Sequence, residues 1–175
     1  MNLESKAIFL DRDGVINYEV GDYIMRLEDF KILPHVGSGL KTLQDAGFLL
    51  IVITNQGGIA KGLYTHAAFE KMHAYLDEEL AKFDVRLTEV FYCPHHPQTG
   101  NCLCRKPGSL LVEKALSKYK INPALSWFIG DKQRDMDAGM GAGVRGILIE
   151  PNENWVPYIQ EMIQLSTSTL LARKN

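Results

Sequence analysis

The chain has 175 residues, 46% of them hydrophobic and 23% charged, which predicts a single globular domain over residues 1–175 with a sizeable core. Its formal net charge of −2 excludes the strongly basic surface that nucleic acids and anionic membranes select, and no apolar run is long enough to cross a bilayer. Met1–Lys6 lacks the basic and then apolar layout of a signal peptide, so we expect a cytoplasmic protein, and with no apolar seam we expect a monomer.

Five short apolar runs predict the strands of a sheet, and the amphipathic segments between them predict helices. The second run, Phe48-Leu-Leu-Ile-Val-Ile53, is apolar throughout, which is typical of a strand covered on both faces. Alternating strands and helices predict an α/β fold, namely a Rossmann-like, doubly wound parallel sheet with helices on both faces. The strands are expected at residues 7–10, 48–53, 89–92, 127–129 and 146–149, and the helices at 36–46, 66–83, 108–119, 135–142 and 155–170.

The segment 66–83 is the most regular helix candidate. Gly47 and Gly143 follow two other candidates, at the position where glycine commonly ends a helix. Three histidines outside the cysteine-rich segment are expected on helices or caps without a functional role: His35, His66 and His73. The apolar face of segment 66–83 is formed by Phe69, Met72, Tyr75 or Leu76, Leu80 and Phe83.

Polar or charged side chains follow each of the first four predicted strands. Any one of these stretches is as typical of a turn or a helix cap as of a site. Together they indicate a site, because ligands of open parallel sheets bind beyond the carboxyl ends of the strands. The four stretches are Asp11-Arg-Asp13-Gly14, Thr54-Asn-Gln-Gly-Gly58, Arg105-Lys106-Pro107, and Gly130-Asp131-Lys132 with Asp135 one turn later.

The charges at these strand ends favour a cation and a phosphate. Asp11, Asp13 and Asp131 would share one crevice, where unscreened carboxylates repel one another. Mg²⁺ relieves that repulsion, because it prefers oxygen ligands and often takes one or two carboxylates together with substrate phosphate oxygens. Lys106 and Arg105 would supply positive charge opposite the metal, a layout that suits an anion bridging metal and lysine.

All three cysteines and two of the five histidines fall within Cys93–Cys104. An odd number of cysteines argues against a disulfide framework. One interpretation is a reactive thiol with His95 or His96 as its base. The other is a tetrahedral zinc site made by the three cysteines and one of the two histidines. The spacing leaves both open, and zinc is favoured because the phosphate chemistry needs no thiol.

Four motifs in order resemble those of the haloacid dehalogenase superfamily of phosphohydrolases: Asp11-x-Asp13-Gly14-Val15, Thr54-Asn55, Lys106 and Gly130-Asp131-x-x-x-Asp135. The resemblance implies that Asp11 attacks phosphorus and that Asp13 protonates the leaving alcohol and later activates water. Thr54 and Lys106 would hold the phosphoryl group. It also implies Mg²⁺ on the Asp11 carboxylate, the Asp13 carbonyl and Asp131, with Asp135 orienting these ligands.

Within the superfamily, three features resemble the phosphatases of D-glycero-D-manno-heptose 1,7-bisphosphate: the segment Thr54–Gly62, the cysteine-rich segment and Lys132. Related histidinol-phosphate phosphatases share the cysteine-rich elements and are the alternative. A catalytically silent phosphate-binding domain is a hypothesis of another class, against which the intact Asp11 and Lys106 argue.

The closer resemblance also implies a set of ligands and contacts in this chain. It implies a phosphorylated sugar as substrate and structural zinc on Cys93, His95, Cys102 and Cys104. The substrate contacts that it implies are Glu19, Val20, Gly21, Asp22, Thr54, Asn55, Gln56, Gly57, Arg105, Lys106 and Lys132. The segments between Asp13 and Thr54 and between Thr54 and Lys106 are too short in predicted elements to hold a separate cap domain.

Overall fold

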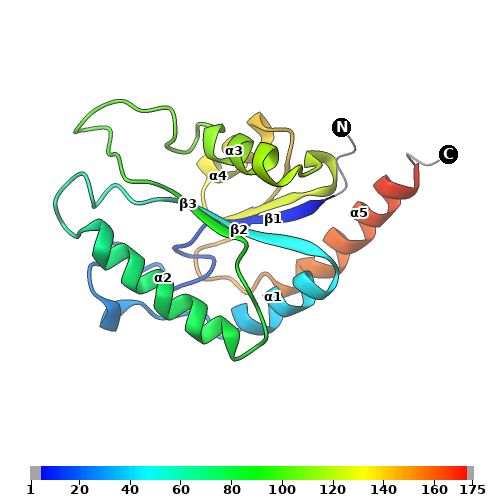
Figure 1. Cartoon of the computed structure of the whole chain (residues 1–175), viewed down its shortest axis with the longest axis horizontal. Coiled ribbons are helices and arrows are strands. Elements are labelled where there is room, and N and C mark those ends of the chain that lie inside the picture. Colours follow the sequence, from blue (N-terminus) through cyan, green and yellow to red (C-terminus); the bar gives the residue numbers. More distant parts are fainter. Residues whose placement is uncertain (1–4, 173–175) are drawn as a thin grey trace.

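The computed structural model describes residues 5–172 and contains a parallel sheet of five strands in the order β3-β2-β1-β4-β5 (Figure 1). The chain fills one half of the sheet from β1 outwards and then crosses to the other side of β1, so the order reverses between β1 and β4. Such a reversal leaves a crevice at the carboxyl ends of the two strands. The strands are β1 (Lys6–Leu10), β2 (Phe48–Asn55), β3 (Glu89–Cys93), β4 (Trp127–Gly130) and β5 (Arg145–Leu148).

Helices cover both faces of the sheet, as the sequence predicts (Figure 1). One face carries α1 (Val36–Asp45), α2 (His66–Ala81) and α5 (Ile159–Ala172). The opposite face carries α3 (Leu110–Tyr119) and α4 (Gln133–Gly141). Short 3-10 helices lie at Leu27–Asp29, Pro123–Leu125 and Val156–Tyr158.

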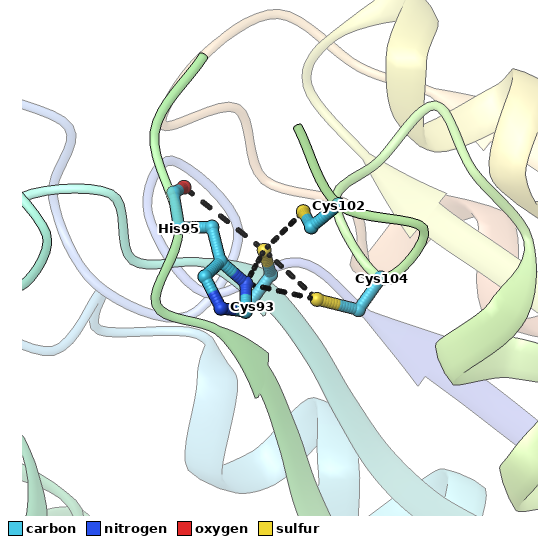
Figure 2. A group of neighbouring side chains, drawn as sticks. All are labelled: Cys93, His95, Cys102 and Cys104. Atoms are coloured by element: carbon cyan, nitrogen blue, oxygen red, sulfur yellow. Dashed lines mark hydrogen bonds between the residues drawn. The ribbon is translucent and has the colours of Figure 1, made fainter. Parts of the chain in front are cut away.

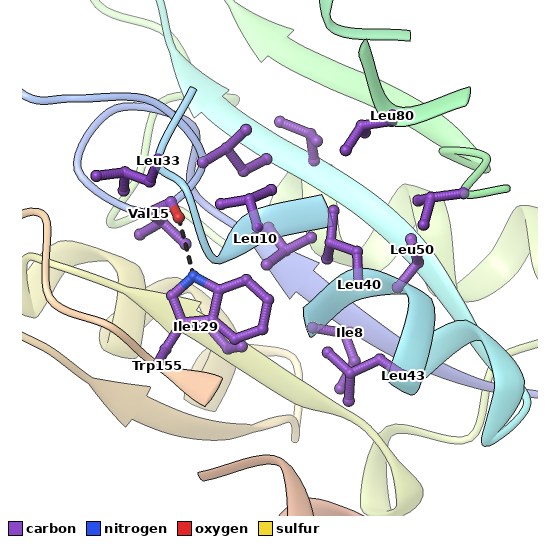
Figure 3. Close-up of a cluster of buried hydrophobic side chains, with 14 of the residues drawn as sticks. Ile8, Leu10, Val15, Leu33, Leu40, Leu43, Leu50, Leu80, Ile129 and Trp155 are labelled. Atoms are coloured by element: carbon purple, nitrogen blue, oxygen red, sulfur yellow. Dashed lines mark hydrogen bonds between the residues drawn. The ribbon is translucent and has the colours of Figure 1, made fainter. Parts of the chain in front are cut away.

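Side chains of the central strands alternate between two hydrophobic cores, which explains why those strands are apolar throughout. In β1, Ile8 and Leu10 face the core under α1, α2 and α5, while Ala7 and Phe9 face the core under α3 and α4. The first core is closed by Trp155, which is fully buried and donates its indole N–H to the Val15 carbonyl at 2.9 Å (Figure 3). That bond ties the loop after β1 to the segment before α5.

The predicted elements are all present, with ends that differ by at most four residues. The face predicted for segment 66–83 is wrong at its last position, because α2 ends at Ala81 and Phe83 is 46% exposed. The Phe83 ring instead lies over α1, where a Cβ on Gly37 would come within 2.5 Å of it. The last helix starts later than predicted, because residues 156–158 form a 3-10 turn that contains Pro157.

Gly47 and Gly143 end α1 and α4 as predicted, with φ of +82° and +77° one residue beyond each C-cap. No helix within residues 5–172 is long and apolar enough to span a membrane. Met1–Lys6, on which the prediction about a signal peptide rests, lies mostly outside the described residues.

Candidate active site

The predicted strand ends open onto a crevice of about 250 Å³. Asp11 and Asp13 line it from the end of β1, and Arg105 lines it from the far side of the cysteine-rich segment. Of the other predicted substrate contacts, four are not part of its lining: Val20, Thr54, Lys106 and Lys132. Val20 is 60% exposed, whereas Thr54 and Lys106 are each 1% exposed. Those that do line it are Glu19, Gly21, Asp22, Asn55, Gln56 and Gly57.

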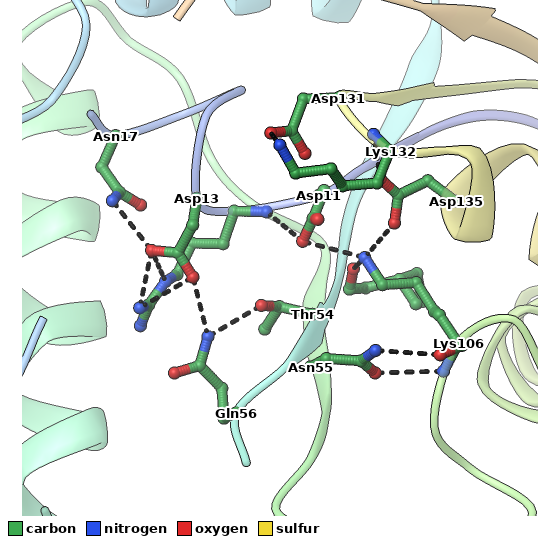
Figure 4. A network of polar contacts seen from close by, with 12 residues as sticks. Asp11, Asp13, Asn17, Thr54, Asn55, Gln56, Lys106, Asp131, Lys132 and Asp135 are labelled. Atoms are coloured by element: carbon green, nitrogen blue, oxygen red, sulfur yellow. Dashed lines mark hydrogen bonds and ion pairs between the residues drawn. The ribbon is translucent and has the colours of Figure 1, made fainter. Parts of the chain in front are cut away.

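A fully buried lysine stands between two carboxylates at the centre of the site. Lys106 Nζ lies 2.8 Å from Asp11 Oδ1 and 2.7 Å from Asp135 Oδ1, and it donates to the Ile53 carbonyl at 2.7 Å (Figure 4). Burial raises the pKa of Asp11 to about 6 despite the opposing charge of Lys106. One ammonium therefore does not balance the buried carboxylates around it.

The surplus of carboxylate oxygen fits a hard divalent cation. Asp11, Asp131 and Asp135 each offer an oxygen, and these oxygens all lie within 4.8 Å of one another. Asp131 Oδ2 is buried and forms an ion pair with the half-exposed Lys132 Nζ at 3.0 Å. Burial raises the pKa of Asp131 as well. Buried carboxylates without enough donors are typical of a site that a cation completes.

Gly14 is required where the chain leaves β1. Its φ is +83°, and a Cβ at this position would lie 2.6 Å from Asp131 Oδ2. Asp135 is held from two sides, because its second oxygen accepts the backbone N–H of Lys132 at 3.0 Å. Asp135 is thus placed to orient its neighbours, as the family resemblance implies.

The Asp13 carboxylate lies outside the group formed by Asp11, Asp131 and Asp135. It accepts hydrogen bonds from Arg12 at 2.9 Å, from Asn17 at 2.9 Å and from Gln56 at 3.1 Å (Figure 4). Burial by itself would raise the pKa of Asp13, but Arg12 and these donors outweigh burial and hold the pKa below its usual value. The two aspartates of the first motif therefore have opposite electrostatic surroundings.

Two predicted substrate contacts have side chains that are engaged within the protein. Asn55 donates to the Lys106 carbonyl and accepts from the Lys106 N–H, both at 3.0 Å, and so holds the lysine backbone. Gln56 is 1% exposed and donates to the hydroxyl of Thr54 at 2.8 Å. The hydroxyl of Tyr64 donates to Gln56 Oε1 at 2.6 Å. These amides therefore support Lys106 and Thr54, two of the residues predicted to be catalytic.

The four predicted zinc ligands converge at the end of β3 (Figure 2). His95 Nδ1 is 3.6 Å from the Cys93 sulfur and 3.3 Å from the Cys104 sulfur. Cys93 lies 3.6 Å from Cys102 and 3.2 Å from Cys104, sulfur to sulfur. Zinc–ligand bonds of about 2.0–2.3 Å put tetrahedral ligands roughly 3.5–3.8 Å apart, close to these distances. His96 lies outside the cluster and accepts the Gln98 N–H instead.

Burial argues against Cys93 as a nucleophilic thiol. It raises the pKa of Cys93 to about 12, so the free thiol would stay protonated. All three cysteines are free of disulfides. The cluster is also linked to the crevice, because Arg105, which lines the crevice, donates from Nη1 to the His95 carbonyl at 3.0 Å.

Sequence reasoning missed two arginines of the crevice. Arg12 is 1% exposed, pairs with Asp13, and has its guanidinium 5.3 Å and 5.6 Å from the ring centroids of Phe30 and Phe69. Arg134 lines the crevice from the first turn of α4, and its buried Nε has no hydrogen-bond partner in the part of the chain that the structure describes. Arg12 sits between two motif aspartates, a signal that was available in the sequence.

The last strand end also supports the site, although it carries no motif. Asn152 lies beyond β5 with φ of +69°. Its side chain accepts the Glu19 N–H at 2.7 Å and donates to the Glu19 carbonyl at 3.1 Å, while its own N–H donates to the Gly14 carbonyl at 2.9 Å. The loop around Glu19 is therefore fastened to the far edge of the sheet.

Comparisons with known proteins agree on one family. The HAD-hydrolase-like family model matches residues 103–154. D-glycero-beta-D-manno-heptose-1,7-bisphosphate 7-phosphatase of Haemophilus ducreyi is 40% identical over 146 residues, which cover 80% of each chain. The alpha-heptose counterpart of Photorhabdus laumondii is 39% identical over 163 residues, 85% of this chain and 88% of the relative. A B. bronchiseptica D,D-heptose 1,7-bisphosphate phosphatase, crystallised with magnesium and phosphate, is 30% identical with a TM-score of 0.78, over 83% of this chain and 80% of that one.

Proposed function

Because this chain belongs to the haloacid dehalogenase-like hydrolases and is a phosphoric monoester hydrolase, we propose that it releases the 7-phosphate of D-glycero-D-manno-heptose 1,7-bisphosphate. The substrate named for the relatives supports this choice. The observation that carries the chemistry is the contrast between Asp11, which faces Lys106 and the carboxylate cluster, and Asp13, which sits in a separate set of donors. A nucleophile and a general acid need different surroundings.

In the first step, Asp11 attacks phosphorus and the sugar oxygen leaves with a proton from Asp13, giving an aspartyl phosphate. Asp13 is ionised in its own network, and the negative charge of an arriving phosphate favours its protonated form. In the second step, Asp13 takes a proton from a water molecule that attacks phosphorus, and Asp11 is regenerated as phosphate leaves. Lys106 and the Thr54 hydroxyl would hold the phosphoryl oxygens.

The grouped oxygens of Asp11, Asp131 and Asp135 fit Mg²⁺. The Asp11 carboxylate, the Asp13 carbonyl and Asp131 would hold the ion, which would neutralise phosphoryl charge and favour the ionised form of Asp11. Cys93, His95, Cys102 and Cys104 fit zinc in a structural role, because the distances among them match a tetrahedron and no open position is needed for the reaction.

The test compares kcat/KM for heptose 1,7-bisphosphate with that for histidinol phosphate, in the presence of Mg²⁺. We expect a preference of about 10- to 150-fold for the bisphosphate, since one well-placed charged contact is worth roughly 1.5–3 kcal/mol. Asp11→Asn is the control and should lose at least about a thousandfold in kcat. Preference for histidinol phosphate would support the alternative substrate, and no turnover of either ester or of an aryl phosphate would support the silent binding domain.

A further inference from the structure

Gln56 occupies a buried position between two catalytic groups and one tyrosine. Its Nε2 donates to Asp13 Oδ2 at 3.1 Å and to Thr54 Oγ1 at 2.8 Å. Its Oε1 accepts from the hydroxyl of Tyr64 at 2.6 Å. Gln56 is 1% exposed and Tyr64 is 7% exposed, so water competes little for these bonds. All three polar contacts of the amide are thus internal to the protein.

The partners determine which way the amide points. An ionised Asp13 can only accept, so the nitrogen of Gln56 must face it. The oxygen of Gln56 then faces Tyr64, whose hydroxyl must donate. Thr54 receives a hydrogen from the same nitrogen, which leaves the hydrogen of its own hydroxyl free to donate elsewhere. The orientation of the Gln56 amide therefore fixes the position of the Asp13 carboxylate and the direction in which the Thr54 hydroxyl can donate its hydrogen.

We propose that Tyr64 is a positioning residue for phosphate-ester hydrolysis, acting through Gln56 on Asp13 and Thr54. The roles of Asp13 and Thr54 rest on the proposed function. Tyr64 lines the crevice, but its hydroxyl is turned to Gln56 and acts on the reacting groups at one remove. Loss of that hydroxyl leaves Oε1 as a buried acceptor without a donor, and the amide is then no longer held from both ends.

The ring and the hydroxyl of Tyr64 have separable roles. The ring packs against Gly58, where a Cβ would come within 2.3 Å of it. Tyr64→Phe keeps that packing and removes only the donor. Gln56→Met keeps the length and bulk of the side chain and removes the amide. These two variants and their combination form a double-mutant cycle that isolates the contact.

The experiment measures kcat and KM of the Mg²⁺-loaded protein on an alkyl phosphate and on p-nitrophenyl phosphate. We expect Tyr64→Phe to lower kcat about tenfold on the alkyl ester, the size of one lost hydrogen bond, with KM within about twofold. The loss should be smaller on the aryl ester, because nitrophenolate leaves without a proton and the acid role of Asp13 in the first step is not needed. In the Gln56→Met background, Tyr64→Phe should have no further effect.

Tyr119→Phe is the matched control, since it removes a hydroxyl that bonds Glu89 at 2.7 Å on the far side of the sheet from α2, and it should leave kcat unchanged. Thermal midpoints check that each variant folds. Equal losses on both esters, additive losses in the cycle, or a rise in KM alone would overturn the proposal. If the unaltered protein hydrolyses neither ester and also leaves heptose 1,7-bisphosphate intact, the proposed function fails. The positioning is then judged by the side-chain NH₂ resonances of Gln56, whose protection from exchange should fall in Tyr64→Phe.

Discussion

Loss of the proposed zinc should impair substrate binding more than turnover, because the two cationic residues after Cys104, Arg105 and Lys106, are held by different parts of the protein. Arg105 is tied to the cysteine cluster through the His95 carbonyl. The backbone N–H and carbonyl of Lys106 are both hydrogen-bonded to the side-chain amide of Asn55, and the Lys106 ammonium also donates to the Ile53 carbonyl. Cys102→Ser removes one ligand and should release the metal. It then frees Arg105 while Lys106 stays in place.

The size of the effect follows from the contact that is lost. A hydrogen bond to a charged group is worth roughly 1.5–3 kcal/mol, so losing the grip of Arg105 on a substrate phosphate should raise KM about 10- to 150-fold. The kcat of Cys102→Ser should stay within about threefold of the unaltered protein, since the bonds to Asn55 remain. Zinc content, measured by atomic absorption on the same samples, should fall from one ion per chain to none.

Asn55→Ala is the complementary variant. It cuts both bonds to the Lys106 backbone and leaves the cysteine cluster intact, so zinc should be retained. Its kcat should fall about 10- to 100-fold, because two hydrogen bonds of roughly 1 kcal/mol each no longer hold the lysine beside Asp11. If Cys102→Ser lowered kcat as much as Asn55→Ala and left KM unchanged, the separate fastening of the two cations would be refuted.

Three further variants test other parts of the molecule. Burial lowers the pKa of His73 from 6.5 to about 4, so the unfolded chain binds this proton more readily, and stability falls as the pH drops from 6.5 to 4. That gap, at roughly 1.4 kcal/mol per pH unit, amounts to roughly 3 kcal/mol, and His73→Leu should remove this dependence in urea titrations at about pH 4.5 and 7.5. Asn152→Ala, which releases Glu19, should raise KM about tenfold with kcat nearly unchanged; an unchanged KM would contradict the fastening. Arg134→Gln should raise KM for a sugar bisphosphate more than for a monophosphate, and equal effects on the two would speak against an anion contact at Arg134.

The strands and most helix ends could be predicted because each is specified locally. Residues such as Ile8 and Phe9 alternate between two cores, and that arrangement needs an apolar side chain at nearly every position of β1. Phe83 misled the helix prediction because its packing partner, Gly37, lies far away in the sequence. The single domain, the monomer and the cytoplasmic location stay predictions.

The motif residues could also be predicted, since Asp11, Thr54 and Asp131 lie at or directly after the end of a strand. Residues that reach the site through tertiary packing could not. Tyr64 meets Gln56 only because the chain turns back before α2. Asn152 meets Glu19 only because β5 and β1 belong to one sheet, separated by β4. No local sequence pattern predicts a contact such as that between Glu19 and Asn152, which are 133 residues apart.

The fastening of Glu19 by Asn152 has a consequence for engineering. Asp11 and Thr54 stand at the ends of inner strands, whereas the backbone of Glu19 is hydrogen-bonded to Asn152, which lies beyond the edge strand β5. A loop transplanted from another phosphatase into residues 20–23 needs to preserve the hydrogen bonds between Glu19 and Asn152. Libraries that vary residues 20–23 and keep Glu19 and Asn152 should therefore yield altered substrate ranges while turnover of small aryl phosphates persists. Such libraries would use the separation, in this fold, between the strand-end residues proposed to hydrolyse the ester and the loop around Glu19 proposed to select the substrate.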